Sequence, residues 1–205
     1  RDLEGMGEKS EDKLLRGIST VESASGRFSI RTAFDYARSL AEHLDDLDEI
    51  ERWEVAGSFR RRKETIGDLD VLILAGDRGA AAEAILGYAP IEEVIGRGEE
   101  KLSVRLDSGL QVDFRYFEPE SFGAALLYFT GSKQHNIVLR RRAVERDWKL
   151  NEYGLFKGEN RLAGKTEESI YHRLNLEWIP PELREDRGEV EVSDRESLPE
   201  LIEPG

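Results

Sequence analysis

The sequence contains no cysteine, and its three histidines are scattered along the chain. A disulfide framework, thiol catalysis and cysteine-bound zinc are therefore excluded, and isolated histidines do not make a zinc site. No run approaches the roughly 18 apolar residues of a membrane span. We therefore expect no membrane partner, and the lack of cysteine is typical of the reducing cytoplasm, where we expect the protein to act, nucleoid-associated when on DNA.

Basic residues are also fewer than acidic ones. The 30 Lys and Arg face 43 Asp and Glu, a net charge of −13, which argues against non-specific nucleic-acid binding because that binding depends on neutralising phosphates. The distribution is uneven, with six cations and two anions from Lys133 to Lys149, and nine acids and three bases from Glu182 to Glu203. Any nucleic-acid face is therefore local. With 205 residues and 39% hydrophobic content, the chain can form one or two domains, and its start suggests an excised piece of a longer protein.

A short apolar run from Val71 to Leu74 predicts a buried strand. Side chains alternate along a strand, so Asp68 and Asp70 would point to the same face. Carboxylate oxygens at this spacing suit Mg²⁺, which also takes water and substrate phosphates as ligands. The alternative is a strand whose edge carries two solvated aspartates.

A glycine–serine turn and a basic cluster precede these carboxylates. Gly57 and Ser58 offer bare backbone and a hydroxyl, and the cations from Arg60 to Lys63 can hold the phosphates that a metal would bridge. In combination with Asp68 and Asp70, the turn resembles the nucleotidyltransferase superfamily. The pattern therefore favours nucleotidyl transfer over a solvated basic turn.

Two stretches of alternating polarity, Lys101–Leu106 and Leu110–Phe117, flank an Asp-Ser-Gly sequence and predict a hairpin. On its second strand, Asp113 shares a face with Arg115 and is the third carboxylate candidate. In isolation, an exposed strand aspartate is an equal alternative. Three carboxylates from two neighbouring strands, however, are what a two-metal phosphoryl-transfer site needs.

The rest of the pattern predicts a scaffold of helices and strands. An amphipathic helix is expected from Ser29, Ser132 is a suitable N-cap for a helix to about Arg146, and a short helix is expected behind Thr166 at Glu167–Leu174. Between two of the predicted helices lies a Tyr-Phe-Thr-Gly-Ser segment, whose aromatic residues could equally belong to the core. The other expected elements are a strand at Trp53–Ala56, helices at Gly79–Tyr88 and Ser121–Phe129, a single strand at Leu150–Phe156 and its partner at Arg161–Ala163.

With the motifs Val112-Asp113-Phe114-Arg115, Tyr128-Phe129-Thr130-Gly131-Ser132 and Asn151-Glu152-Tyr153-Gly154-Leu155, the chain resembles a family X DNA polymerase of the bacterial and archaeal branch. The resemblance implies an α+β fold: a nucleotidyltransferase-fold palm, with a mixed β-sheet and helices on one face, plus a small α/β thumb. The implied divisions are a remnant of the fingers' helix-hairpin-helix at 1–20, the palm at 21–118, the thumb at 119–184 and an acidic linker at 185–205.

The resemblance also implies an activity. A DNA-directed DNA polymerase would transfer a nucleotide from a dNTP to a primer 3′-hydroxyl on gapped or primer-template DNA, using two Mg²⁺ ions that Mn²⁺ can replace. Gap-filling repair, including base excision repair, and a monomeric state are expected. Lyase and metallophosphatase activities are not. Two alternatives stay open: transfer to an acceptor other than DNA, and a fragment that binds nucleotide and metal but scarcely polymerises.

Each site residue receives a role from the same resemblance. Asp68, Asp70 and Asp113 would be catalytic and metal-binding. Gly5 and Gly7, in an apolar-Gly-x-Gly turn, would hold a DNA phosphate, although a plain helix-capping turn is an equal alternative. The remaining expected roles are nucleotide binding by Gly57, Ser58, Arg61, Gly67, Tyr128, Phe129, Gly131 and Asn136, DNA binding by Lys101 and Arg140, and a conformational switch formed by Arg115 and Glu152.

Overall fold

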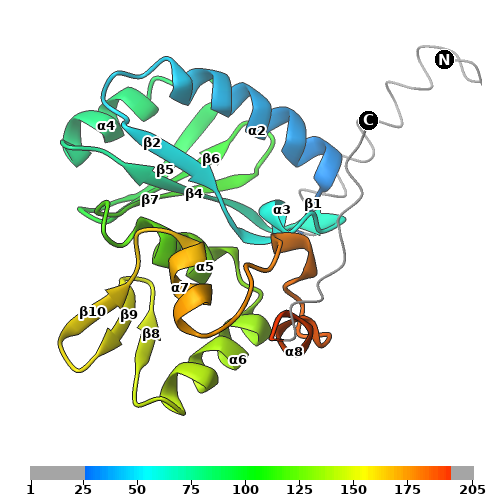
Figure 1. Ribbon diagram of the computed structural model, residues 1–205. Helices are drawn as coiled ribbons and strands as arrows, with labels where there is room; N and C mark the ends of the chain where they lie inside the picture. Colours follow the sequence, from blue (N-terminus) through cyan, green and yellow to red (C-terminus); the bar gives the residue numbers. More distant parts are fainter. Residues whose placement is uncertain (1–25, 195–205) are drawn as a thin grey trace, which may run out of the picture.

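The structure is a computed structural model in which residues 26–194 are described, and they form two lobes (Figure 1). The first lobe, residues 26–118, contains a five-stranded sheet, and the second lobe, residues 119–194, combines helices with a three-stranded sheet. The α+β class with a mixed sheet is confirmed. The expected turn containing Gly5 and Gly7 lies outside the described residues.

The sheet of the first lobe is mixed because strands β4 and β7 run parallel while the other neighbours are antiparallel. Its strand order is β2-β4-β7-β6-β5, which places the parallel pair inside the sheet. The predicted hairpin is confirmed as β6 and β7. The strands are β2 (Arg52–Val55), β4 (Asp68–Leu74), β5 (Ile91–Arg97), β6 (Lys101–Leu106) and β7 (Gln111–Tyr116).

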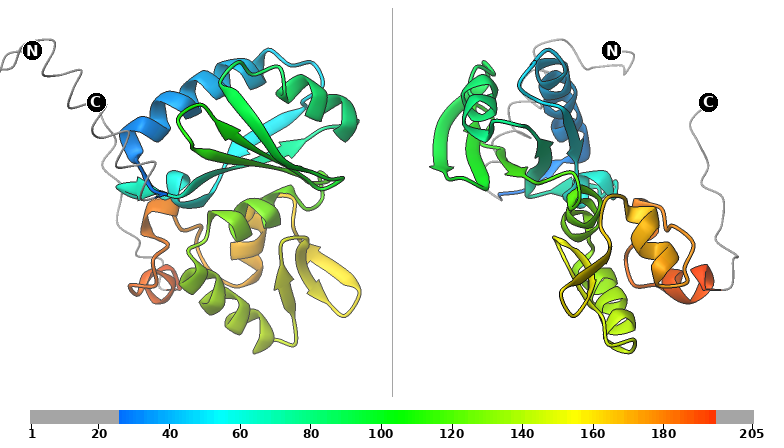
Figure 2. Two further views of the ribbon diagram at one scale, coloured as in Figure 1. Left: turned by 180° about the vertical axis from the view of Figure 1, so that it is seen from behind. Right: turned by 60° about the vertical axis from the view of Figure 1, so that its left-hand side comes forward.

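One face of this sheet is covered by helices α2 (Ile30–Asp45) and α4 (Arg78–Ile85) (Figure 2). Leu69 and Val71 of β4 belong to the hydrophobic core that includes these helices. Because side chains alternate along the strand, burying this set leaves the two aspartates of β4 on the opposite face.

The opposite face is covered at the carboxyl end of β4. There Ala56 and Leu72 form a hydrophobic cluster with helix α5 (Phe122–Thr130) of the second lobe. The first lobe's own helices α2 and α4 cover one face, as expected, and the second lobe covers part of the other. The amino end of β4, where Asp68 is exposed, stays open.

The second lobe arranges its helices around a three-stranded antiparallel sheet of order β10-β9-β8. Its core includes Leu127, Leu139, Leu155 and Ile170. Among the described residues, no helix combines the length and the apolar character needed to cross a membrane. The elements are α6 (Lys133–Val144), β8 (Lys149–Asn151), β9 (Gly154–Lys157), β10 (Asn160–Ala163) and α7 (Glu167–Arg173).

The N-cap predicted at Ser132 is confirmed, and Ser29 and Thr166 cap the helices expected at their positions. Each hydroxyl accepts a hydrogen bond from the amide three residues along the chain, at 3.2 Å for Ser29 and Thr166 and at 3.3 Å for Ser132. Such a bond satisfies one of the free amides at the start of a helix. The starts of α2, α6 and α7 are therefore set by local sequence.

The predicted single strand from Leu150 to Phe156 is wrong. Strands β8 and β9 pair antiparallel across a turn at Glu152 and Tyr153. Asn151 closes the turn, since its Oδ1 accepts a hydrogen bond from the Tyr153 amide at 3.0 Å. Strand β5 was not predicted, because its side chains are largely exposed and show no alternation. Other short elements are β1 (Phe28–Ser29), β3 (Thr65–Ile66) and the single helical turn α3 (Gly57–Arg60).

The expected acidic linker is wrong for residues 185–194. After the 3₁₀ turn η1 (Pro181–Leu183), the chain forms helix α8 (Glu189–Ser193) on the second lobe. Glu189 Oε1 lies 2.7 Å from His135 Nδ1, and both side chains are buried. Acids in this segment therefore serve as partners within the fold, which composition does not indicate.

Candidate active site

Three carboxylates meet on the open face of the first lobe's sheet. Asp70 of β4 and Asp113 of β7 are register partners in the parallel pair, and Asp68 precedes Asp70 on the same face. One oxygen atom from each residue lies within 4.8 Å of the other two. The structure therefore brings together the three carboxylates that the sequence singled out.

The environment of these carboxylates shifts their pKa values in different directions. Burial, followed by the charge of Asp68, raises the pKa of Asp70 to about 6. Burial, followed by the charge of Asp113, raises the pKa of Asp68. Burial also acts to raise the pKa of Asp113, but hydrogen bonds from Lys101, Ser103 and other donors outweigh it and lower that pKa.

Asp113 is held by four side-chain donors. Its Oδ1 accepts hydrogen bonds from Ser103 Oγ at 2.7 Å and Gln111 Nε2 at 3.0 Å. Its Oδ2 accepts from Lys101 Nζ at 2.9 Å and Arg115 Nη2 at 3.2 Å. Sequence reasoning gave no role to Ser103, although it is the register partner of Asp113 on β6. The hairpin register is the signal that could have found it.

The donor set fits a hard divalent cation. It consists of oxygen atoms from three carboxylates, the chemistry of Mg²⁺ and Mn²⁺ sites. Lys101 and Arg115 now supply the positive charge at these oxygens. A divalent cation bound there would take over that role and would favour the ionised forms of Asp68 and Asp70.

Gly57 lies directly against the carboxylate of Asp70. Its φ is +66°, and a Cβ at this position would be 2.9 Å from Asp70 Oδ2. Glycine alone satisfies both the backbone conformation and the space. Ser58 follows it in α3. A Cβ at Gly67, by contrast, would meet nothing within 4 Å, so the backbone before Asp68 is open to a ligand.

The cations after Ser58 pair with acids of the second lobe. Arg60 makes a two-point ion pair with Glu167, with both N–O distances at 2.9 Å. Arg61 Nε donates to Glu185 Oε1 at 2.9 Å, and its Nη1 donates to the carbonyl of Thr130. The expected phosphate-binding arginine is therefore engaged by a carboxylate. The remaining pairs are Arg62 with Glu182 at 2.8 Å and Lys63 with Glu185 at 3.4 Å.

The Tyr-Phe-Thr-Gly-Ser segment ends α5 beside the carboxylate site. The rings of Tyr128 and Phe129 are 5.0 Å apart, edge to face. The guanidinium of Arg115 lies 4.4 Å from the centre of the Phe129 ring. Gly131 ends the helix with a φ of +70°, and its Cβ position would be 3.3 Å from Arg61 Nη1. The segment therefore touches arginines from both the basic cluster and β7.

Asn136 and Arg140 connect α6 to the same segment. Asn136 Nδ2 donates to the carbonyl of Tyr128 at 2.7 Å, and Arg140 Nε donates to the carbonyl of Asn136 at 3.2 Å. All three side chains line a small pocket with Leu150. The structure therefore groups the residues that were expected to contact the nucleotide base and the template.

Residues 125–185 match the family model described as DNA polymerase beta thumb. Over 204 residues, 97% of this chain, the sequence is 39% identical to the DNA polymerase/3'-5' exonuclease PolX of Bacillus subtilis strain 168. The chain belongs to the family X DNA polymerases. It spans 36% of the length of the Bacillus relative. It is also 26% identical over 162 residues to the Repair DNA polymerase X of African swine fever virus isolate Tick/Malawi/Lil 20-1/1983, covering 75% of this chain and 90% of the viral protein.

In this family X chain, Arg115 links the carboxylates to the second lobe. Its Nε lies 3.4 Å from Asp70 Oδ1, in addition to its contact with Asp113. Glu152, in the turn between β8 and β9, lines a cavity of about 190 Å³ together with Arg115 and Lys101. The two expected switch residues therefore border one cavity, while Arg115 is paired with the aspartates.

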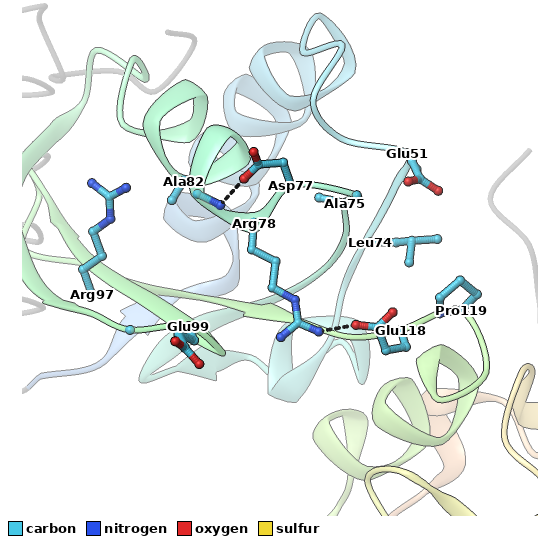
Figure 3. Close-up of a pocket in the computed structure, with 13 residues that line it drawn as sticks. Glu51, Leu74, Ala75, Asp77, Arg78, Ala82, Arg97, Glu99, Glu118 and Pro119 are labelled. Atoms are coloured by element: carbon cyan, nitrogen blue, oxygen red, sulfur yellow. Dashed lines mark hydrogen bonds and ion pairs between the residues drawn. The ribbon is translucent and has the colours of Figure 1, made fainter.

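Another cavity of this family X chain, of about 940 Å³, lies away from the carboxylates (Figure 3). Asp77, on its wall, caps α4 by accepting hydrogen bonds from the amides of Gly79 and Ala80 at 2.9 and 3.0 Å. Arg78 donates to Glu118 across the cavity at 2.5 Å. Asp77 is thus satisfied by backbone amides, and Arg78 and Glu118 satisfy each other, so we assign the cavity no part in the chemistry.

Proposed function

We propose that this chain carries the polymerase centre of a DNA-directed DNA polymerase. The primer 3′-hydroxyl attacks the α-phosphate of a dNTP, a bond forms between O3′ and phosphorus, the bond to the bridging oxygen breaks, and pyrophosphate leaves. The observation that carries the proposal is the cluster of Asp68, Asp70 and Asp113 with Gly57 packed against it. The printed names of the Bacillus and viral relatives, both polymerases, support it.

The carboxylates are the proposed ligands of two Mg²⁺ ions, which Mn²⁺ can replace. Asp68 and Asp70 would hold both ions, and Asp113 would complete the shell of one. Bound there, the ions would neutralise the triphosphate and make the primer hydroxyl more acidic. Lys101 and Arg115 occupy some of the same oxygens, so these side chains must move away as the ions bind.

Asp113 is the proposed acceptor of the primer hydroxyl's proton. Ser103 and Gln111 fix its Oδ1, whereas its Oδ2 is held by two long cationic side chains. Oδ2 is therefore the oxygen that can exchange its partners for a hydroxyl group. Lys101, whose side chain is 41% exposed, would then be free to contact a DNA phosphate.

The residues between the two lobes form the proposed nucleotide site. Gly57, Ser58 and Arg61 would bind the β- and γ-phosphates, and Gly67 would let the nucleotide approach the backbone. A flat aromatic ring and a bare backbone near the sugar leave no room for a 2′-hydroxyl, which favours deoxynucleotides. The contacts to sugar and base would come from Tyr128, Phe129, Gly131 and Asn136, and the template contact from Arg140.

Arg115 and Glu152 form the proposed switch. While Arg115 pairs with Asp70, it occupies an oxygen needed for metal binding. Transfer of Arg115 to Glu152, which borders the same cavity, would release Asp70. Closing of the second lobe over the nucleotide is the proposed cause of the exchange.

The proposed setting is gap-filling DNA repair; the printed name of the viral relatives, Repair DNA polymerase X, supports the repair part of this proposal. Gly5 and Gly7 would hold a phosphate of the gapped DNA. A second candidate deserves a test, because the chain spans 36% of the Bacillus relative. In that case the chain would bind nucleotide and metal but extend primers poorly without the rest of the protein.

Primer extension on single-nucleotide gapped DNA, with one dNTP and either Mg²⁺ or Mn²⁺, tests the proposal. Asp113→Asn should lower the rate by roughly a thousandfold or more, since it removes the negative charge of a metal ligand and the proton acceptor. The same variant should still bind a metal–dNTP complex, because Asp68 and Asp70 remain. Asp35→Asn is the matched control, since this side chain is 66% exposed and lies on α2. Unchanged extension by Asp113→Asn would remove Asp113 from the chemistry.

A further inference from the structure

Glu185 occupies two cations of the basic cluster. Its Oε1 accepts a hydrogen bond from Arg61 Nε at 2.9 Å and lies 3.4 Å from Lys63 Nζ. The side chains of Arg61 and Glu185 are 14% and 21% exposed, so this pair is sheltered from solvent screening. Two cations that converge on one carboxylate oxygen offer the same donors that a phosphate oxygen needs.

Arg61 is fixed in a position beside the carboxylate site. Its amide donates to the carbonyl of Gly57 at 3.3 Å, and Gly57 is the residue packed against Asp70. Its Nη1 donates to the carbonyl of Thr130. With one end of the guanidinium anchored in this way, the Nε edge faces Glu185. An anion bound between Arg61 and the aspartates would therefore compete for that edge.

Glu185 is itself held in place by the backbone on both sides. The carbonyl of Arg184 accepts a hydrogen bond from the Ser132 amide at 3.0 Å. The amides of Asp186 and Arg187 donate to the carboxylate of Glu189 at 2.9 and 2.7 Å. The Glu185 carboxylate therefore stays close to Arg61 even when a ligand displaces it, and it can return when the ligand leaves.

The neighbouring ion pairs do not share this geometry. The Glu167 side chain is only 3% exposed and is shared by Arg60 and Arg184, whereas the Glu185 side chain is 21% exposed, so solvent and ligands reach Glu185 more easily. Arg62 is 71% exposed, so its pair with Glu182 is screened by water. Glu185 is thus the carboxylate that a ligand's phosphate groups would meet when they approach Arg61.

We propose that Glu185 is an internal competitor for the triphosphate, holding Arg61 and Lys63 until phosphate groups displace its carboxylate. This inference rests on the proposed function, in which Arg61 binds the nucleotide's phosphates. A single carboxylate yields to a triphosphate, which carries more charge, but competes well with a weaker anion. Glu185 therefore lowers the affinity for every phosphate ligand and speeds the departure of pyrophosphate.

The test measures the binding of inorganic tripolyphosphate by calorimetry, with Mg²⁺ present and at fixed ionic strength. Glu185→Gln keeps the size of the side chain and removes its charge. We expect this variant to bind tripolyphosphate about tenfold more tightly, which corresponds to the loss of one charge-assisted competitor. Glu182→Gln, the matched control on the exposed Arg62, should bind within about twofold of the unchanged chain. Equal gains in both variants would overturn the proposal, because they would reflect net charge alone.

An Arg61→Ala background separates a local competitor from a general electrostatic effect. In that background, Glu185→Gln should increase the affinity for tripolyphosphate by a clearly smaller factor, since the main contact of Glu185 is gone. A gain of the same size, or no gain in the chain with Arg61 intact, would overturn the proposal. Should Glu185→Gln fail to fold, Glu185→Asp, which draws the carboxylate back, should show an intermediate gain.

Gap filling then distinguishes this inference from the proposed function. Glu185→Gln should lower the apparent KM for dNTP and strengthen inhibition by pyrophosphate by a similar factor. If Glu185→Gln bound tripolyphosphate tenfold more tightly, but neither this variant nor the unchanged chain extended primers, the competitor proposal would be supported and the polymerase proposal contradicted. Extension with an unchanged affinity for tripolyphosphate would support the polymerase and overturn the competitor.

Discussion

Asp70 is the residue on which the contacts of the site converge. It faces Asp113 across the parallel strands, its Oδ1 is 3.4 Å from Arg115 Nε, and a Cβ at Gly57 would lie 2.9 Å from its Oδ2. Burial and the neighbouring charge of Asp68 raise its pKa to about 6. A bound cation would stabilise the ionised form of this carboxylate. Gly57, which packs against it, limits its position.

Gly57→Ala should therefore displace the Asp70 carboxylate and weaken metal binding, in addition to straining the backbone. The new Cβ would lie 2.9 Å from Asp70 Oδ2, and the alanine would have to adopt a φ of +66°. We expect a stability loss of about 1–3 kcal/mol in urea unfolding and a weaker affinity for Mn²⁺. Gly158→Ala is the matched control, because its φ is +58° and its Cβ would meet nothing within 4 Å. If both variants kept the same Mn²⁺ affinity, Gly57 would not be positioning Asp70.

At the scale of elements, α3 and α7 are joined through a buried group of charges. Glu167, the first residue of α7, pairs with Arg60 of α3 and with Arg184, whose Nη1 lies 2.6 Å from Glu167 Oε1. Trp178 Nε1 donates to the same carboxylate at 3.0 Å. These contacts tie the loop that carries Arg61 to the second lobe. Arg60 therefore serves the fold, even though it is next to the proposed phosphate-binding arginine.

This group predicts a specific loss of stability in acid. Burial acts to raise the pKa of Glu167, but Arg184 and Arg60 outweigh it and lower that pKa from 4.5 to about 2. Because the folded-state pKa is depressed, the stabilisation is present above about pH 4.5 and is lost as the pH falls towards 2. The loss from this group should be on the order of 3 kcal/mol in urea unfolding.

Glu167→Gln should flatten the stability profile between pH 4.5 and 2 and should be less stable at neutral pH, since Arg60 and Arg184 lose their partner. Glu83→Gln is the control, because that side chain is 69% exposed in its pair with Arg97. An acid profile of Glu167→Gln as steep as that of the unchanged chain would contradict the assignment.

At the scale of the whole molecule, the net charge of −13 is distributed so that acids of the second lobe cover the basic cluster of the first. Both Figure 1 and Figure 2 show the segment around η1 next to α3. Among the described residues, we propose the cations of the Lys133–Lys149 segment, together with Lys101, for contact with DNA. A local face of this kind predicts weak binding.

DNA affinity should accordingly be weak and strongly dependent on salt. With a few phosphates neutralised, log K should fall against log salt with a slope of about −3 to −5, from roughly −0.9 per contact. Arg140→Ala should weaken binding to primer-template more than to single strands, because its proposed contact is with the paired template. Fluorescence anisotropy at several salt concentrations measures both effects. Arg38→Ala on α2, whose side chain is 66% exposed, is the control, and tight, salt-independent binding would contradict the local face.

The sequence by itself determined the features that follow from short-range rules. Alternation along β4 places Asp68 and Asp70 on one face, and the Asp-Ser-Gly turn fixes the β6–β7 hairpin. Ser29, Ser132 and Thr166 mark helix starts through hydrogen bonds within one turn. The sequence motifs also indicated the family.

Only the tertiary structure decided which distant groups meet. Asp113 reaches Asp70 because β7 lies parallel to β4, a pairing that no local pattern specifies. Glu185 is 124 residues from Arg61, and the fold turned a segment predicted to be a linker into the partner of the basic cluster. Strand β5 was missed because an exposed edge strand need not alternate. In each case the deciding contact joins residues far apart in the chain, and the packing of whole elements, rather than local periodicity, sets it.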